Sequence, residues 1–166
     1  MKIKLKINLS LLVVLMPCIL LLGEPSSNEK INSATGSEVE GLKLTISTTN
    51  KVFQLGQPIH LSISLQNVTT NNLVVPTTGQ IMSVEVIGPD GKAVQETAFG
   101  TKMLHPTIFV SHFSESLSPD QNLRMGAGLT AWFCITNSGE YTVTVLREIA
   151  KTKHISAGPL KIRIIQ

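Results

Sequence analysis

Apolar and polar residues alternate one by one along several short segments of this 166-residue chain, and this alternation is its strongest structural constraint. The clearest run covers residues 59–65, and the same pattern marks residues 42–46, 82–86, 141–145 and 160–164. A period of two places successive side chains on opposite faces of a β-strand, so each run predicts a strand with one buried face. Turn signals recur roughly every 8–12 residues, which predicts an all-β antiparallel sandwich or barrel of about seven to nine strands.

Weaker signals assign the rest of the domain. Residues 89–91, Pro-Asp-Gly, predict a tight hairpin turn, because proline presets φ and glycine accepts a left-handed backbone. Residues 92–96 are then expected as the returning strand, and residues 129–135 as a later strand. A short strand near 107–112 is also expected, because a connection over 97–128 without structure would be long for a compact domain. No segment of the domain shows the apolar spacing of a helix.

The first 23 residues are interpreted as an export signal. Lys2, Lys4 and Lys6 supply a positively charged start, and Leu9–Leu22 form an uncharged run of 14 residues. As a helix this run would span about 21 Å, which is too short for a hydrocarbon layer of roughly 30 Å and is typical of a signal peptide.

The chain is therefore expected to be secreted, periplasmic or on the cell surface. Residues 24–40, rich in Ser, Asn, Glu and Gly, predict a flexible linker before a single folded domain over 41–166. Two alternatives keep the N-terminus at the membrane. Cys18 could carry a lipid, although Pro17 stands where that signal has a small residue, or the first segment could remain as an uncleaved anchor.

Charge excludes nucleic acid as a partner. Three of the 14 Lys and Arg, and none of the 11 Asp and Glu, lie in the first 23 residues, so the remainder of the chain carries no net charge. Such a chain lacks the basic field that attracts nucleic acid.

Cys134 would be the one cysteine left after cleavage, so no internal disulfide is expected. It lies in the apolar run 132–135, which favours a buried structural thiol over an intermolecular disulfide or a catalytic thiolate.

The turn before Tyr141 resembles a known element. Asn137-x-Gly139-x-Tyr141 is similar to the D-x-G-x-Y tyrosine corner of immunoglobulin-like domains, with Asn in place of Asp. The resemblance implies that Tyr141 begins strand F and hydrogen-bonds to backbone across the E–F corner. Val143 stands where antibody-type domains have a cysteine, so no pinning disulfide is implied.

A broader resemblance is to exported bacterial immunoglobulin-like modules, including the BsuPI-type proteinase inhibitor domains. It is carried by the turn-forming segments 53–59, 65–67, 90–91, 117–121 and 139–143. It implies an immunoglobulin-like β-sandwich over most of residues 41–166 more securely than it implies an activity.

The sequence shows no catalytic motif and no paired carboxylates, so no catalytic residue, metal ligand or cofactor is assigned. His105, His112 and Glu115 could bind zinc if their connection folds back, but the spacing of the two histidines is not a recognised ligand pattern. His154 is expected in a solvated basic loop with Arg147, Lys151 and Lys153.

Binding residues are assigned from exposed aromatics. Phe99, Phe109 and Phe113 could form an apolar patch for a protein, peptide or glycan, or instead cap the core. The final strand is a candidate for pairing with a partner peptide, although its Lys161 and Arg163 would protect it. The residues assigned structural roles are Tyr141, Gly139, Asn137, Trp132, Asp90 and Gly91.

Three hypotheses of function follow. The first is an exported, non-enzymatic binding or structural module of the cell envelope or extracellular space. The second is a proteinase inhibitor, which the BsuPI-like resemblance implies. The third is a small secreted metal-binding enzyme, or an enzyme accessory, that uses the 97–128 connection.

Overall fold

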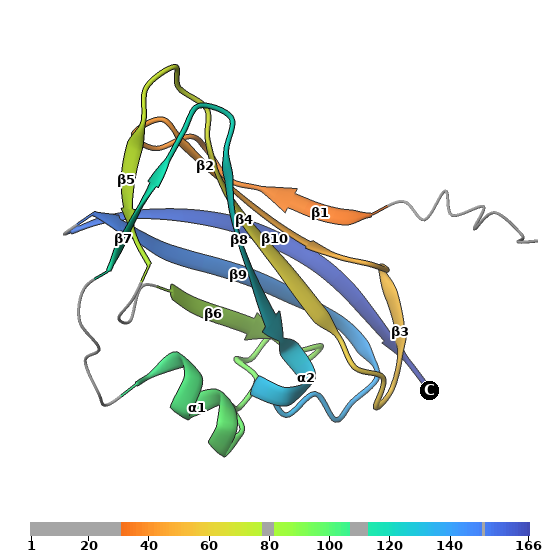
Figure 1. Cartoon of the computed structure of the whole chain (residues 1–166). Coiled ribbons are helices and arrows are strands. Elements are labelled where there is room, and N and C mark those ends of the chain that lie inside the picture. The colour runs from red at the N-terminus through yellow and green to blue at the C-terminus, as the bar shows by residue number, and fades with distance from the viewer. Residues whose placement is uncertain (1–30, 78–81, 107–112, 151) are drawn as a thin grey trace, which may run out of the picture.

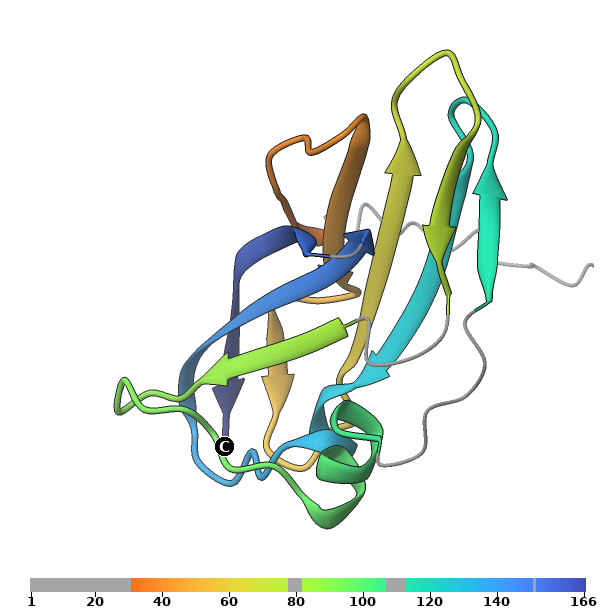
Figure 2. The same ribbon diagram turned by 90° about the vertical axis from the view of Figure 1, so that its left-hand side faces the viewer.

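The structure of the protein is a computed structural model that describes residues 31–77, 82–106, 113–150 and 152–166. This part of the chain forms ten β-strands and two short helices. Eight strands make two four-stranded sheets, and the other two make a separate ribbon. Figures 1 and 2 show the two sheets facing each other, with both helices at one end of the molecule.

The pairing of the strands defines the two layers. The first sheet is antiparallel and has the order β1 (Asn32–Thr35), β2 (Leu42–Thr48), β4 (His60–Asn67) and β8 (Asn122–Gly128). The second has the order β3 (Val52–Gln54), β10 (Lys153–Ile165), β9 (Gly139–Ala150) and β6 (Met82–Ile87). Its pairs are antiparallel except β3 with β10, which is parallel. The antiparallel ribbon consists of β5 (Leu73–Pro76) and β7 (Ser114–Leu117).

This order is that of an immunoglobulin-like sandwich, in which one sheet holds strands A, B and E and the other holds C, F and G. The strands β2, β4 and β8 take the first three places, and β6, β9 and β10 take the others. The strand at the D position, β7, pairs with β5 instead of β8. The predicted all-β immunoglobulin-like sandwich is confirmed.

The core lies between the sheets and is built by the alternation seen in the sequence. Leu61, Ile63 and Leu65 of β4 are buried, as are Val143 and Val145 of β9. Full burial of such a side chain contributes about 1.5–3 kcal/mol, so the inward rows hold the two sheets together.

The prediction that the domain has no helix, and that residues 129–135 are a strand, is wrong. Helix α1 spans Ala98–Leu104 and helix α2 spans Leu129–Trp132. Helices of one or two turns are too short to show an apolar period in the sequence, and their stability comes from packing. Gly100 of α1 lies so close to the Trp132 carbonyl that an added Cβ would collide with it.

Two other expected strands differ. Residues 92–96 make isolated bridges at Ala93 and Glu96 instead of a continuous strand. The strand expected near 107–112 lies outside the described residues.

Part of the expected linker belongs to a sheet, because β1 pairs with β2 along its whole length. The sequence did not predict this strand, because its residues are small or polar and none of them is fully buried. Residues 1–30, with the expected export signal, lie outside the described residues. Among the described residues, no helix is long and apolar enough to cross a membrane.

The turn before β9 has the contact expected of a tyrosine corner. The Tyr141 hydroxyl donates to the Asn137 carbonyl at 2.7 Å and accepts from the Asn137 amide at 3.3 Å. Gly139 has φ of 141°, and a Cβ there would collide with the ring of Pro89. The corner therefore sets where β9 begins and joins it to the hairpin that follows β6.

Candidate functional site

The edge strand β6 begins a hairpin that opens into a fork. In the turn at residues 88–91, the Gly91 amide donates to the Gly88 carbonyl at 3.0 Å, and Gly91 has φ of 77°. The Lys92 amide donates to the Asp90 carboxylate at 3.1 Å. Asp90 and Gly91 thus hold the turn that their sequence predicts.

The two arms of the hairpin stay paired for a short distance only. The Gly88 amide donates to the Lys92 carbonyl at 2.8 Å. The Val94 amide donates to the Val86 carbonyl, also at 2.8 Å. Beyond this point the arms diverge, as Figure 2 shows. We call the space between β6 and residues 93–96 the β6 fork.

The returning arm leaves β6 because it pairs with the chain around α2. The Cys134 amide donates to the Gln95 carbonyl at 2.8 Å. The Thr97 amide donates to the Trp132 carbonyl at the same distance. These bonds to a distant segment keep the fork open.

The β6 fork holds a groove of about 510 Å³ on the outer face of the second sheet. Part of its floor is a row across three strands in which Ser83, Leu146 and Ser156 are register partners. Leu146 is 42% exposed between these two small side chains. Glu85 and Thr144 form the next row. An exposed leucine in a hollow is a surface suited to a partner's apolar side chain.

The groove also reaches the core. Val84, Val86 and Phe133, all buried, contribute to its lining. Ala93 and Val94 line its other side. The groove is thus an apolar cleft between two extended segments of backbone.

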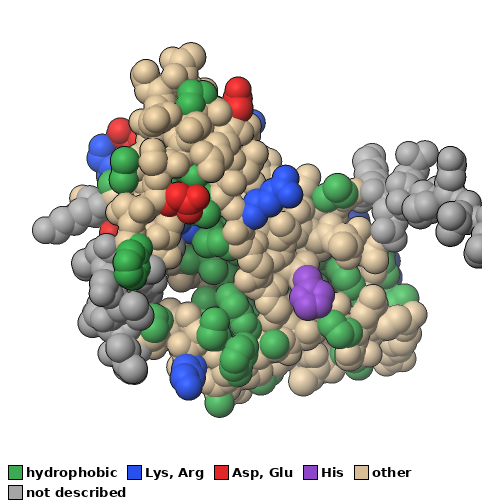
Figure 3. Space-filling model, in the orientation of Figure 1, with side chains coloured by type: hydrophobic (Ala, Val, Ile, Leu, Met, Phe, Trp, Pro, Cys, Tyr) green, Lys and Arg blue, Asp and Glu red, His purple; other side chains and the backbone are tan. Residues whose placement is uncertain are grey.

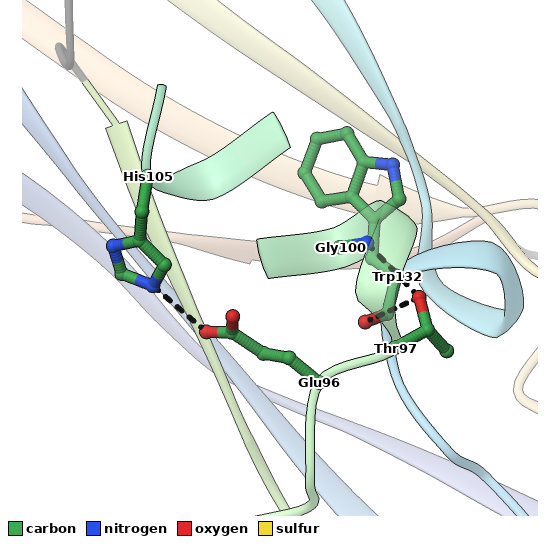
Figure 4. Close-up of polar contacts among 5 residues, drawn as sticks. All are labelled: Glu96, Thr97, Gly100, His105 and Trp132. Carbon is green, nitrogen blue, oxygen red and sulfur yellow. Dashed lines mark hydrogen bonds and ion pairs between the residues drawn. The ribbon is translucent and has the colours of Figure 1, made fainter. Parts of the chain in front are cut away.

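All charge within the lining comes from carboxylates. Glu85 and Glu96 line the groove, and none of its lining residues is Lys, Arg or His. His105 Nε2 lies 3.1 Å from a carboxylate oxygen of Glu96, and 53% of the His105 side chain is exposed (Figure 4). The groove therefore favours a partner with positive charge.

A helical cap supports this end of the molecule. The Thr97 hydroxyl accepts from the Gly100 amide at 2.9 Å, which caps the N-terminus of α1 (Figure 4). It also donates to the Ala131 carbonyl at 2.6 Å. Trp132 is buried, with 7% of its surface exposed. One threonine thus ties α1 to α2 and fixes the arm that carries Glu96.

The structure places the predicted binding residues on separate elements. Phe99 lies on α1, and Phe113 directly precedes β7. Both are exposed, and Met103 is half exposed one turn from Phe99. Figure 3 shows hydrophobic side chains gathered at the end of the molecule that carries α1 and α2. Phe109 lies outside the described residues.

Two predictions about polar residues are wrong, those for Cys134 and Arg147. The zinc alternative gains no support, since His105 lies beside Glu96 and His112 lies outside the described residues. Among the described residues, no three His, Cys, Asp or Glu side chains come together in a way that could hold a metal ion. Cys134 is exposed, because the alternation of its extended segment buries Phe133 and turns the thiol outward. Arg147 is fully buried on β9 and does not lie in a solvated loop.

The opposite end of the molecule is a polar tip built on Asn67, a fully buried side chain. Its Nδ2 donates to the carbonyls of Leu117 (2.9 Å) and Asn71 (2.7 Å). Its Oδ1 accepts from the amide (2.9 Å) and the hydroxyl (2.7 Å) of Thr69. We call the turns 68–72 and 118–121 the tip. Burial and four hydrogen bonds give the Asn67 side chain a structural role.

The backbone of Asn67 joins the second turn of the tip. Its carbonyl accepts from the Asp120 amide at 3.0 Å, and its amide donates to the Gln121 carbonyl at 3.1 Å. The Gln121 side chain accepts from the Ser118 amide at 2.8 Å. Both turns of the tip are therefore fixed by one buried residue.

Among known proteins, no family model and no curated protein matches this chain. Similar solved structures include the C-terminal domain of Wzt, with a TM-score of 0.46 and 11% identity over 82% of this chain and 79% of that chain. Another is the CARDB domain of a Pyrococcus furiosus protein, with a TM-score of 0.40 and 14% identity over 78% of this chain and 95% of that chain.

A third similar structure is a β-glucosidase from Listeria innocua, with a TM-score of 0.39 and 12% identity over 75% of this chain. The match covers only 16% of the glucosidase chain.

Proposed function

We propose that this protein is an exported, non-enzymatic binding module that recognises its partner at the β6 fork. The observation that carries the proposal is the groove itself, in which an exposed Leu146 and two carboxylates line an opening beside an edge strand. Grooves lined mainly by apolar atoms, with a few polar groups that fix orientation, are typical of binding sites.

Photo-crosslinking tests the site. A crosslinking amino acid replaces Leu146 in the full chain expressed in its own cells, and Leu55 is replaced in a matched control, because the two leucines are 42% and 43% exposed. Leu146 should give discrete adducts that Leu55 does not give. Equal labelling from both positions, or none from Leu146, would refute the site.

Export is a separate part of the proposal and rests on the sequence of the first 23 residues. N-terminal sequencing of protein recovered from outside the cytoplasm should begin after residue 23. Recovery of intact chain from the cytosol would contradict export but would leave the binding site untouched.

A second candidate function, inhibition of a proteinase, is supported by the tip. A standard inhibitor presents a loop already held in its bound conformation, because a rigid loop loses little entropy on binding. The two turns of the tip meet this requirement through Asn67 and its hydrogen bonds.

Inhibition assays against serine, cysteine, aspartic and metalloproteinases test this function. A stable equimolar complex that is weakened by Pro119→Gly would support it, because that change loosens a turn residue without altering charge. No inhibition of any of the four classes would remove it.

A further inference from the structure

We propose that the β6 fork binds an extended peptide segment of a partner as an added β-strand, and that this segment carries Lys or Arg beside apolar residues. The inference deepens the proposed function and rests on it. It is argued from the direction of the backbone groups, the shape of the groove and its charge.

The outer edge of β6 presents backbone groups to the fork. In an antiparallel strand the N–H and C=O of one residue point to the same side, and the next residue points to the other side. The Val86 carbonyl and the Gly88 amide bond to the returning arm, so they point away from β9. Val84 has the same parity, and its N–H and C=O therefore point into the fork. In the described part of the chain, β6 is the last strand of its sheet.

The returning arm presents its own groups from the other side. The Gln95 carbonyl and the Thr97 amide point toward the chain around α2, where they are bonded. Glu96 lies between them and has the opposite parity, so its backbone groups face β6. The fork thus has two walls of β-type backbone, Val84 on one side and Glu96 on the other, with a groove of about 510 Å³ between them.

Two facing walls of this kind match an extended strand. Main-chain hydrogen bonds provide affinity when a strand adds to a sheet edge, and pockets for alternate side chains provide specificity. Leu146, on the outer face beside β6, offers an apolar contact for such a side chain. An edge strand with unpaired backbone is the usual template for this pairing.

Charge selects a basic partner over a second copy of this chain. Glu85 and Glu96 are the charged side chains of the groove, and Glu85 makes no ion pair with any described residue. Pairing of two β6 strands about a two-fold axis would place both Glu85 carboxylates on the same face, where like charges repel. A strand with Lys or Arg gains attraction at the same position.

The test uses the full chain and two short synthetic peptides, one alternating valine with lysine and the other valine with glutamate. The lysine peptide should bind, and the glutamate peptide should bind at least about tenfold more weakly. Glu85→Lys should weaken binding of the lysine peptide by about tenfold or more and favour the glutamate peptide.

Matched variants outside the groove control for general effects. Glu38→Lys makes the same charge change at another exposed position, and Leu55→Ser matches Leu146→Ser in exposure. Neither control should alter peptide binding, whereas Leu146→Ser should weaken it. Circular dichroism establishes that each variant is folded.

Amide hydrogen exchange separates strand addition from binding by side chains alone. The Val84 and Glu96 amides should exchange at least about tenfold more slowly in the complex, because each gains a backbone partner. Binding that depends on Glu85 without this protection would overturn strand addition and leave the proposed binding site in place. No binding of the lysine peptide, equal binding of both peptides, or dimerisation of the chain through Glu85 would overturn the inference, and Leu146 crosslinking would still test the site independently.

Discussion

Asn67 and Arg147 are two fully buried polar side chains in one sandwich, and they differ in how completely their polar atoms are hydrogen-bonded. Asn67 uses both donors of its amide and accepts two hydrogen bonds at its oxygen. Each polar group that leaves water there has a partner, so its burial is compensated. The result is a residue that fixes the two turns of the tip.

Arg147 is only partly satisfied. Its Nη1 donates to the Met125 sulfur at 2.7 Å and its Nη2 to the Pro76 carbonyl at 2.8 Å, but its Nε has no partner among the described residues. It also makes no ion pair there. Burial lowers the pKa of its guanidinium to about 10.

The position of Arg147 explains why a cation is tolerated. Its side chain extends from β9 to Met125 on β8 and Pro76 on β5, and so links the second sheet to the first sheet and to the β5–β7 ribbon. A long side chain with several donors bridges a gap that a branched apolar residue would not span. The comparison indicates that a buried polar side chain stabilises the folded state when all its polar atoms are hydrogen-bonded. It costs free energy of folding when some of those atoms have no partner.

The largest effect is expected from Asn67→Ala. Removal of the amide takes away a donor to the Leu117 and Asn71 carbonyls and the acceptor of the Thr69 amide, and should reduce the free energy of unfolding by about 3 kcal/mol. Urea unfolding measures the change. Asn122→Ala, which loses an exposed hydrogen bond to Ser64, is the control and should cost far less.

Arg147→Met should act in the opposite direction. Methionine is long and flexible enough to fill the same space without a charge, so we expect the free energy of unfolding to rise by about 1–2 kcal/mol. The same urea experiment applies. A loss of stability comparable to that of Asn67→Ala would show that the guanidinium is a net stabilising group.

The pH dependence of unfolding should differ between the original chain and Arg147→Met. The unfolded arginine keeps its ordinary, higher pKa, so above about pH 10 the unfolded chain binds more protons than the folded chain. The original chain should therefore gain stability relative to Arg147→Met as pH rises through about 10. Unfolding of both proteins at pH 9 and pH 11 measures this difference and cancels the titration of other groups. A constant difference would mean that the pKa of Arg147 is not lowered.

Thr69→Val tests how far the satisfaction of Asn67 depends on one partner. The hydroxyl contact to Oδ1 is lost while the amide contact remains, so a cost of about 1 kcal/mol is expected. A cost near that of Asn67→Ala would mean that the tip collapses as a unit.

Met125→Leu should have the smallest effect, about 0.5 kcal/mol, because sulfur is a weak acceptor and leucine nearly conserves the volume. Thermal unfolding, with the Arg147→Met, Met125→Leu double variant, measures it. In that background the effect of Met125→Leu should change, since its polar partner is gone.

Much of the fold could be predicted from the sequence, because alternation is a local property that survives without any tertiary contact. The strands around Ile63, Val84 and Val143 are where the period of two indicates. The contact between Tyr141 and Asn137 follows from a turn motif only a few residues long. The two helices and β1 were not predicted, because their sequences are short or polar and their conformations depend on packing.

The candidate site could not be predicted in the same way. The expected aromatic residues Phe99 and Phe113 lie on separate elements. The final strand, a candidate for peptide pairing, pairs with β9 along one edge and with β3 along the other over Arg163–Ile165. The fork requires Gln95 to bond Cys134, and no local pattern encodes that pairing. The exposed Leu146 in an otherwise alternating strand is the one signal in the sequence that could have drawn attention to this face.

The sequence by itself determined the strands with clear alternation, which face of each is buried, and the turns at residues 89–91 and before Tyr141, since these depend on residues close together in the chain. Only the tertiary structure decided which edge stays open, which histidine meets which carboxylate, and that Arg147 is buried. Those outcomes depend on partners far away along the chain, such as Pro76, which lies 71 residues before the arginine that it bonds.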